Sequence, residues 1–83
     1  MKQYMISFRS VTYAQRGERS LTRGGFSCTV SRTPKWMEQQ GCGYGVLLRT
    51  ENIHAAMEIL LREGIAWRKV YVRQGGTYRE LGL

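Results

Sequence analysis

Cys42 is the side chain best suited to chemistry in this 83-residue sequence, because it stands between two glycines. Gly41 and Gly43 have no side chains to shield a thiol, and their backbone can take turn conformations that are closed to other residues. A thiol presented in this way can attack a sulfur donor and store the transferred atom as a persulfide. We therefore expect sulfur chemistry, with Cys42 as the catalytic or carrier thiol and the two glycines as parts of its site.

Positive charge near this thiol comes from Arg32 and Lys35, which we include among the binding residues. A cation lowers the pKa of a nearby thiol and raises the fraction of reactive thiolate. One feature opposes this effect, since a short helix expected over residues 34–40 would direct its negative end toward Cys42. Activation would then depend on these cations or on backbone N–H groups of the glycine turn. An incidental loop cysteine remains the alternative.

The other candidate side chains favour structural roles. Cys28 alternates with Phe26 and Val30, which is typical of a small buried hydrophobe in a strand. His54 lies off the apolar stripe of the second expected helix, with no serine, carboxylate or second metal ligand spaced to work with it. The two cysteines lack both zinc-site spacing and a disulfide framework. We expect no metal, no cofactor and a reducing, cytoplasmic location.

Length and charge limit the class of protein further. A chain of 83 residues has room for one modest core and little room for a deep active-site cavity. We expect one domain over residues 1–74 and a tail over residues 75–83 that is mobile or docks a partner. No segment has the length of a signal peptide's apolar run or of a membrane span. The net charge of +7 favours contact with phosphate, acidic protein surfaces or other anions.

An internal repeat organises the chain, since an offset of 40 residues aligns its two halves. Each half reads strand, helix, strand, with a helix N-cap residue type after the first strand and a glycine where a left-handed C-cap would end the helix. Two such units give the order βαββαβ. The aligned pairs are Arg9 with Arg49, Ser10 with Thr50, Glu18 with Glu58, Leu21 with Leu61, Gly24 with Gly64 and Val30 with Val70.

This order predicts an α+β fold, a ferredoxin-like two-layer sandwich. Its four-stranded antiparallel sheet would have the order 4-1-3-2, with both helices on one face. Alternation assigns the side chains to two faces. Toward the helices we expect Ile6, Phe8, Phe26, Cys28, Val30, Val46, Leu48, Val70 and Val72. On the open face we expect Met5, Ser7, Arg9, Ser27, Thr29, Leu47, Arg49, Trp67, Lys69, Tyr71 and Arg73.

Several short motifs together resemble a small bacterial family of domains of unknown function labelled a selenium/sulfur carrier-like protein. The resemblance covers roughly residues 3 to 74. It rests on Phe8-Arg9-Ser10 followed by Ala14, Glu18 and Leu21, then on Thr33-Pro34-Lys35 and Cys42-Gly43. The resemblance implies that Cys42 is the carrier thiol. The chain differs from the family pattern at Lys35, where arginine is usual, and at Tyr44-Gly45.

Two function classes follow. In the first, Cys42 receives a sulfur or selenium atom from a donor such as a cysteine desulfurase and passes it to an acceptor protein. In the second, the chain is a nucleic-acid- or protein-binding module, because Gly43–Leu47 partly imitates the ribonucleoprotein motif of RNA-recognition domains. Arg9, together with Arg49, Lys69 and Arg73, would then neutralise phosphates. The aromatic residues of the open face also lead us to expect a homodimer.

Overall fold

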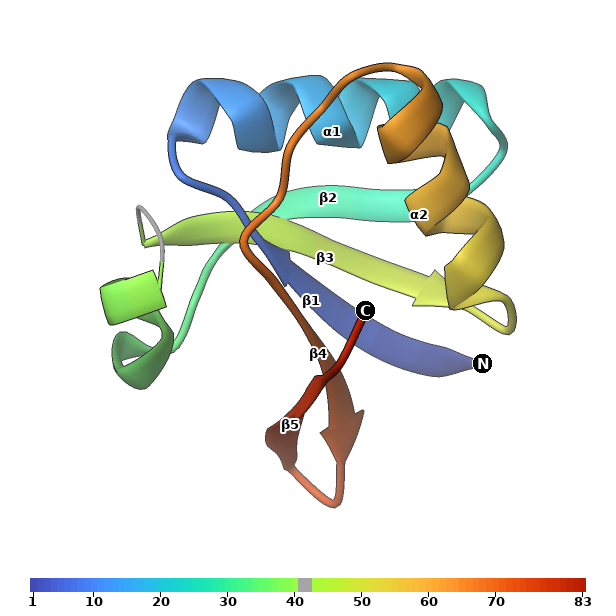
Figure 1. Cartoon of the computed structure of the whole chain (residues 1–83). Coiled ribbons are helices and arrows are strands. Elements are labelled where there is room, and N and C mark those ends of the chain that lie inside the picture. Colours follow the sequence, from blue (N-terminus) through green and yellow to red (C-terminus); the bar gives the residue numbers. More distant parts are fainter. Residues whose placement is uncertain (41–42) are drawn as a thin grey trace.

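The computed structural model describes residues 1–40 and 43–83 of the chain. Eight elements follow one another in the order βαβ, a short 3-10 helix, then βαββ (Figure 1). They are β1 (Lys2–Ser7), α1 (Val11–Arg23), β2 (Ser27–Arg32), the 3-10 helix η1 (Lys35–Gln40), β3 (Tyr44–Thr50), α2 (Ile53–Arg62), β4 (Lys69–Gln74) and β5 (Thr77–Leu81).

The sheet has the strand order β2-β3-β1-β4-β5, and every neighbouring pair is antiparallel. The predicted order of the first four strands is confirmed, and the α+β class with it. The predicted number of strands was wrong, because residues 77–81 add β5 beside β4. Gly75 and Gly76 form the two-residue turn of this hairpin with φ angles of 56° and 86°. A Gly-Gly pair is a known signal for such a turn.

The helix ends show where the repeat fails. Ser10 caps α1 as predicted, since its hydroxyl accepts a hydrogen bond from the N–H of Tyr13 at 3.2 Å. The N-cap of α2 is Asn52 and not Thr50, because β3 continues through Thr50 and the helix starts later. The predicted left-handed conformation is present at Gly64, with φ of 71°. At the end of α1 the left-handed residue is Gly25, with φ of 90°, and not the predicted Gly24.

The helix-facing side of the sheet forms the main core. Both α-helices cover this one face, and their apolar stripes complete the cluster. The predicted inward residues all belong to it, although those of β2 are only partly buried because β2 is an edge strand. Cys28, expected to be largely buried, is half-buried for this reason. The buried cluster contains Tyr4, Ile6, Phe8, Ala14, Leu21, Val46, Leu48, Ile53, Ala56, Met57, Leu60, Ile65, Val70 and Val72.

The opposite face is not open, which corrects the prediction for its side chains. Met5 and Tyr71 form a second buried cluster there with Met37 of η1. Leu47 and Tyr78 pack against this cluster, so that η1 and the β5 hairpin cover the centre of the face. Trp67 was also placed wrongly, because it precedes β4 and packs against the main core.

Candidate functional site

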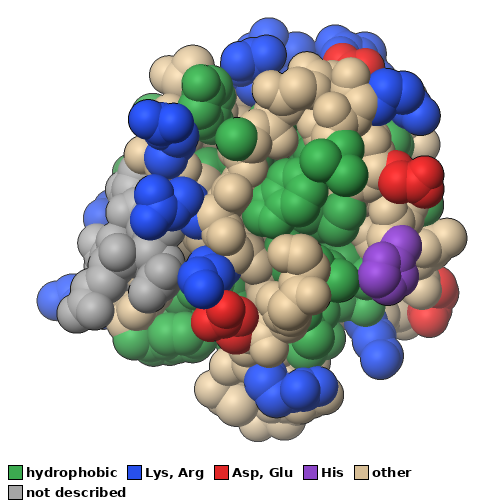
Figure 2. Space-filling model, in the orientation of Figure 1, with side chains coloured by type: hydrophobic (Ala, Val, Ile, Leu, Met, Phe, Trp, Pro, Cys, Tyr) green, Lys and Arg blue, Asp and Glu red, His purple; other side chains and the backbone are tan. Residues whose placement is uncertain are grey.

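The candidate site lies at one end of the sheet, where four strands begin or finish. β1 pairs Ser7 with Gly45 of β3 and with Lys69 of β4, and β2 pairs Ser31 with the same Gly45. These pairings bring the final residues of β1 and β2 next to the first residues of β3 and β4. Figure 2, drawn in the orientation of Figure 1, shows Lys and Arg side chains gathered at this end of the molecule, on the left. We call it the basic end.

The connection between β2 and β3 is closed at its base by one backbone hydrogen bond. The N–H of Thr33 donates to the carbonyl oxygen of Gly43 at 3.0 Å. This bond continues the ladder beyond its last strand pair, Arg32 with Tyr44. Gly43 is buried and has a φ of 85°, a backbone conformation that a residue with a Cβ adopts only with strain. The predicted site residues Gly41 and Cys42 lie outside the described residues.

Thr33 lies beside this closing bond and has a buried hydroxyl. The residue is 8% exposed, and its Oγ1 has no hydrogen-bond partner among the described residues. Its methyl group lies 3.2 Å from the position that a Cβ on Gly45 would take. The same Cβ would lie 2.5 Å from the carbonyl oxygen of Ile6, so Gly45 permits a close approach of β1, β3 and the loop. A buried donor without a partner costs free energy and is therefore uncommon in folded proteins.

The 3-10 helix η1 forms the first part of the β2–β3 connection and packs against the sheet through Met37. Its start is a turn in which the N–H of Met37 donates to the carbonyl oxygen of Pro34 at 2.9 Å. Met37 is fully buried against Met5 and Tyr71. Trp36 is 52% exposed and meets the ring of Tyr71 edge-on, with 5.3 Å between ring centroids. The predicted short helix over residues 34–40 is thus present in 3-10 form.

The predicted cationic residues all have exposed side chains. The guanidinium of Arg32 lies over the ring of Tyr44 at 5.3 Å. Arg9 follows β1 and lies over the ring of Tyr13 at 5.8 Å. Lys35 is exposed at the start of η1. The topology therefore brings Arg9 and Arg32 to the same end of the sheet, and each guanidinium is attracted to the face of its ring.

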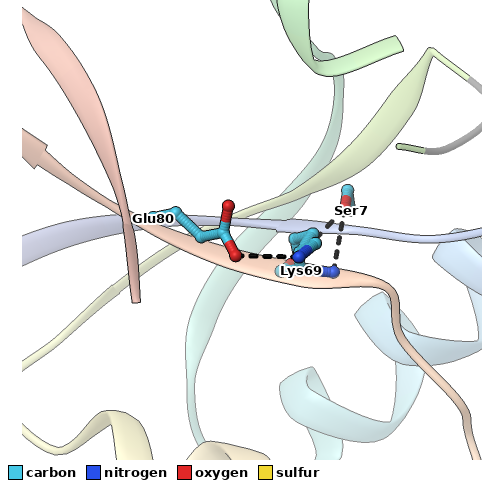
Figure 3. A network of polar contacts seen from close by, with 3 residues as sticks. All are labelled: Ser7, Lys69 and Glu80. Carbon is cyan, nitrogen blue, oxygen red and sulfur yellow. Dashed lines mark hydrogen bonds and ion pairs between the residues drawn. The ribbon is translucent and has the colours of Figure 1, made fainter. Parts of the chain in front are cut away.

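A polar network at the basic end had no counterpart in the sequence prediction. The hydroxyl of Ser7 accepts from the backbone N–H of Lys69 at 3.1 Å and donates to its carbonyl oxygen at 3.4 Å (Figure 3). The ammonium of Lys69 donates to Oε2 of Glu80 at 2.9 Å. This hydrogen bond raises the pKa of Lys69. The ion pair between Lys69 and Glu80 could not be predicted without β5, the strand that contains Glu80.

The second thiol, Cys28, has a less reactive environment. Its Sγ lies 3.5 Å from Oγ1 of Thr22 and donates to the carbonyl oxygen of Glu18 at 3.6 Å. Partial burial raises the pKa of Cys28, and the carboxylate of Glu18 raises it further, against the hydrogen bond from Thr22. The carboxylate of Glu18 also accepts a hydrogen bond from the backbone N–H of Val30, in the edge strand β2, at 2.9 Å. Cys28 is thus a structural thiol that resists conversion to thiolate.

The surface predicted for nucleic acid differs from the prediction at two of its residues. Tyr71 is 1% exposed beneath Met37, and Lys69 is paired with Glu80. The face expected to form a homodimer is covered at its centre by η1 and the β5 hairpin, which buries Tyr71. Across residues 1–40 and 43–83, no three His, Cys, Asp or Glu side chains are grouped so that they could hold a metal ion. No helix in that part of the chain is long and apolar enough to cross a membrane.

The sequence model of the family described as "Putative Se/S carrier protein-like" matches residues 3–72. These residues span the chain from β1 into β4 and include the whole connection between β2 and β3. Neither a curated protein nor a solved structure matches the chain.

Proposed function

This chain belongs to the Se/S carrier-like family, and on that premise we propose that Cys42 holds a sulfur or selenium atom for transfer to an acceptor. The protein acts as a carrier rather than as a stand-alone enzyme. Its partners are a donor, of the cysteine desulfurase type or another source of sulfane sulfur or selenium, and an acceptor protein.

The transfer step needs one thiolate and no redox partner. The thiolate of Cys42 attacks the terminal sulfur of a donor persulfide, R–S–SH. One S–S bond forms to Cys42 while the donor S–S bond breaks, and the electron pair leaves with the donor thiolate R–S⁻. An acceptor nucleophile then attacks the terminal sulfur in the same way and regenerates the thiolate of Cys42. A selenium atom would be held as the corresponding selenosulfide.

The anchored base of the β2–β3 connection is the observation that supports this proposal best. Gly43 is fixed to Thr33 by a backbone hydrogen bond, and Met37 fixes η1 in the second cluster. The residue that precedes Gly43 in the chain is therefore joined to a rigid support at the basic end. Arg32 and Lys35 add positive potential there, which favours a thiolate over a thiol.

The hydroxyl of Thr33 supplies a second element of the proposed site. It is a buried donor without a partner among the described residues, and it belongs to the residue that is bonded to Gly43. A charged sulfur on Cys42, either thiolate or persulfide, would accept a hydrogen bond from it. Such a bond stabilises the charged form. We assign Thr33 a positioning role that acts through the sulfur of Cys42.

Native-state alkylation tests the difference between the two thiols. Brief treatment with iodoacetamide at neutral pH, followed by peptide mass analysis, should label Cys42 well before Cys28. Cys28 is disfavoured because burial and Glu18 raise its pKa. The Arg32→Gln and Lys35→Gln variants should slow labelling of Cys42, whereas Arg73→Gln, which removes an equal charge from β4, should not. Labelling of both thiols at one rate would contradict the assignment.

A further inference from the structure

A cavity of about 110 Å³ lies on the helical layer and takes no part in the proposed carrier site. It opens between the second half of α1 and the segment that follows α2. Because α1 starts at the basic end, its last turns lie toward the opposite end of the sheet (Figure 1). Lys and Arg side chains follow the upper edge of the molecule in Figure 2, where α1 runs. The cavity is lined by Arg16, Arg19, Ser20, Arg23, Glu63 and Ile65.

The charges around this cavity are unbalanced. Arg16, Arg19 and Arg23 are three and four residues apart, so their guanidinium groups share one face of α1. The single carboxylate of the lining is Glu63, whose Oε1 lies 3.3 Å from Nη2 of Arg23. Three positive charges and one negative charge leave two positive charges for a ligand.

Two of the three guanidinium groups are available to an anion. Arg19 has no hydrogen-bond or ion-pair partner within the described part of the chain. Arg16 contacts the ring of Tyr13 at 5.7 Å, which leaves its N–H groups free to donate in the plane of the guanidinium. Like charges at these helix spacings repel each other, so a bound anion would relieve a strain present in the free protein.

The floor of the cavity is built from buried residues. Ser20 is 5% exposed and accepts a hydrogen bond from Nη2 of Arg23 at 3.4 Å. Ile65 is 3% exposed beside it. A buried floor removes water from one side of a ligand and strengthens its hydrogen bonds to the guanidinium groups above. The structure thus combines a defined hollow with donors around its rim.

We propose that this cavity binds a tetrahedral dianion of the phosphate class, either free inorganic phosphate or a terminal phosphate monoester. Guanidinium groups bind phosphate oxygens through paired N–H donors, and a dianion matches the two uncompensated charges. A carboxylate of an acidic protein carries one charge and would leave the second uncompensated. The small volume also favours a compact ligand over a polypeptide segment.

Phosphate titration of the full chain, followed by ¹H–¹⁵N NMR at constant ionic strength in sodium chloride, tests this site. Saturable shifts should appear at the amides of Arg16, Arg19 and Ser20. Loss of one charge-assisted donor in Arg19→Gln should weaken binding about tenfold. Glu63→Gln should tighten binding a few-fold, because it releases Arg23. The control Arg73→Gln, on β4 and outside the cavity, should bind as the wild type does.

Two further binding experiments distinguish a phosphate monoester from free phosphate and from an acidic peptide. A short oligonucleotide with a 5′-phosphate is compared with the same strand carrying a 5′-hydroxyl, and a glutamate-rich peptide is added separately. Preference for the phosphorylated strand over inorganic phosphate indicates a monoester ligand, while equal or weaker binding indicates free phosphate. Equal loss of affinity in Arg19→Gln and Arg73→Gln would overturn the proposal, as would shifts caused by the peptide and not by phosphate.

Discussion

At the scale of single residues, the surroundings of Cys28 explain why this thiol is a poor nucleophile. Cys28 is half-buried between Thr22 and the backbone of Glu18, where a thiolate would lose hydration and meet a negative charge. Cys42 is followed by Gly43, whose carbonyl is bonded to Thr33 at the basic end. The sequence predicted the helix-facing position of Cys28 correctly, because its alternation with Phe26 and Val30 marks that side of a strand.

The raised pKa of Cys28 predicts a pH dependence of stability. Above its ordinary value of 9.0 the thiol ionises in the unfolded chain but stays protonated in the folded one. Its contribution is therefore complete below pH 9 and is lost as the pH rises through the folded-state pKa. Urea unfolding at about pH 7 and pH 10 should show a larger decrease in the free energy of unfolding for the wild type than for Cys28→Ala. Equal decreases would show that the fold does not hold this thiol protonated.

Thr33 offers a test that separates folding from transfer. Thr33→Val removes a buried hydroxyl that has no partner in the described structure, so the free energy of unfolding should equal or exceed that of wild type. Loading of Cys42 from a persulfide donor should nevertheless slow several-fold, because the charged sulfur loses a donor. Thr33→Ser keeps the hydroxyl and should load at the wild-type rate. A Val variant that loads normally would remove Thr33 from the site.

At the scale of elements, η1 has two tasks that its sequence only partly indicated. It anchors the connection that carries Cys42, and its Met37 covers Met5 and Tyr71 on the sheet. Pro34 and the polar residues that follow predicted a short helix there. The docking of that helix was missed, because alternation assigns a side chain to a face of the sheet without saying what covers that face.

Truncation of Met37 measures how firmly η1 is held. Met37→Ala should lower the free energy of unfolding by about 2 to 5 kcal/mol, since it leaves a cavity beside Met5 and Tyr71. Leu61→Ala serves as the control, because Leu61 is 68% exposed and its truncation should cost less than about 1 kcal/mol. Chemical denaturation monitored by circular dichroism compares the two. Equal costs would mean that η1 is not anchored by Met37.

Strand order and helix placement followed from the repeat because both halves share the strand–helix–strand pattern with the same offset. The repeat was a poorer guide to the helix caps and to the number of strands, where the two halves of the chain differ. Thr50 has the residue type of a cap but ends β3, and Asn52 takes over its role. β5 has no equivalent in the first half, so a repeat could not predict it.

At the scale of the whole molecule, two groups of cations meet at the ring of Tyr13, because the guanidinium groups of Arg9 and Arg16 both lie over it. One is the basic end, which includes Arg9 and Arg32, and another is the cavity rim formed by α1. The net charge of +7 is evident from the composition, but this arrangement of the cations depends on the topology. The first group includes Arg32, beside the base of the β2–β3 connection, and we propose that the second group binds a phosphate group.

Intact-mass measurement of sulfur uptake tests the carrier function most directly. The full chain is incubated with a cysteine desulfurase and cysteine, and then its mass is determined without reductant. Wild type and Cys28→Ser should each gain the mass of one sulfur atom, and a reductant should remove it. Cys42→Ser should gain none. Uptake that persists in Cys42→Ser, or is lost in Cys28→Ser while that variant remains folded, would contradict the assignment of Cys42 as the carrier thiol.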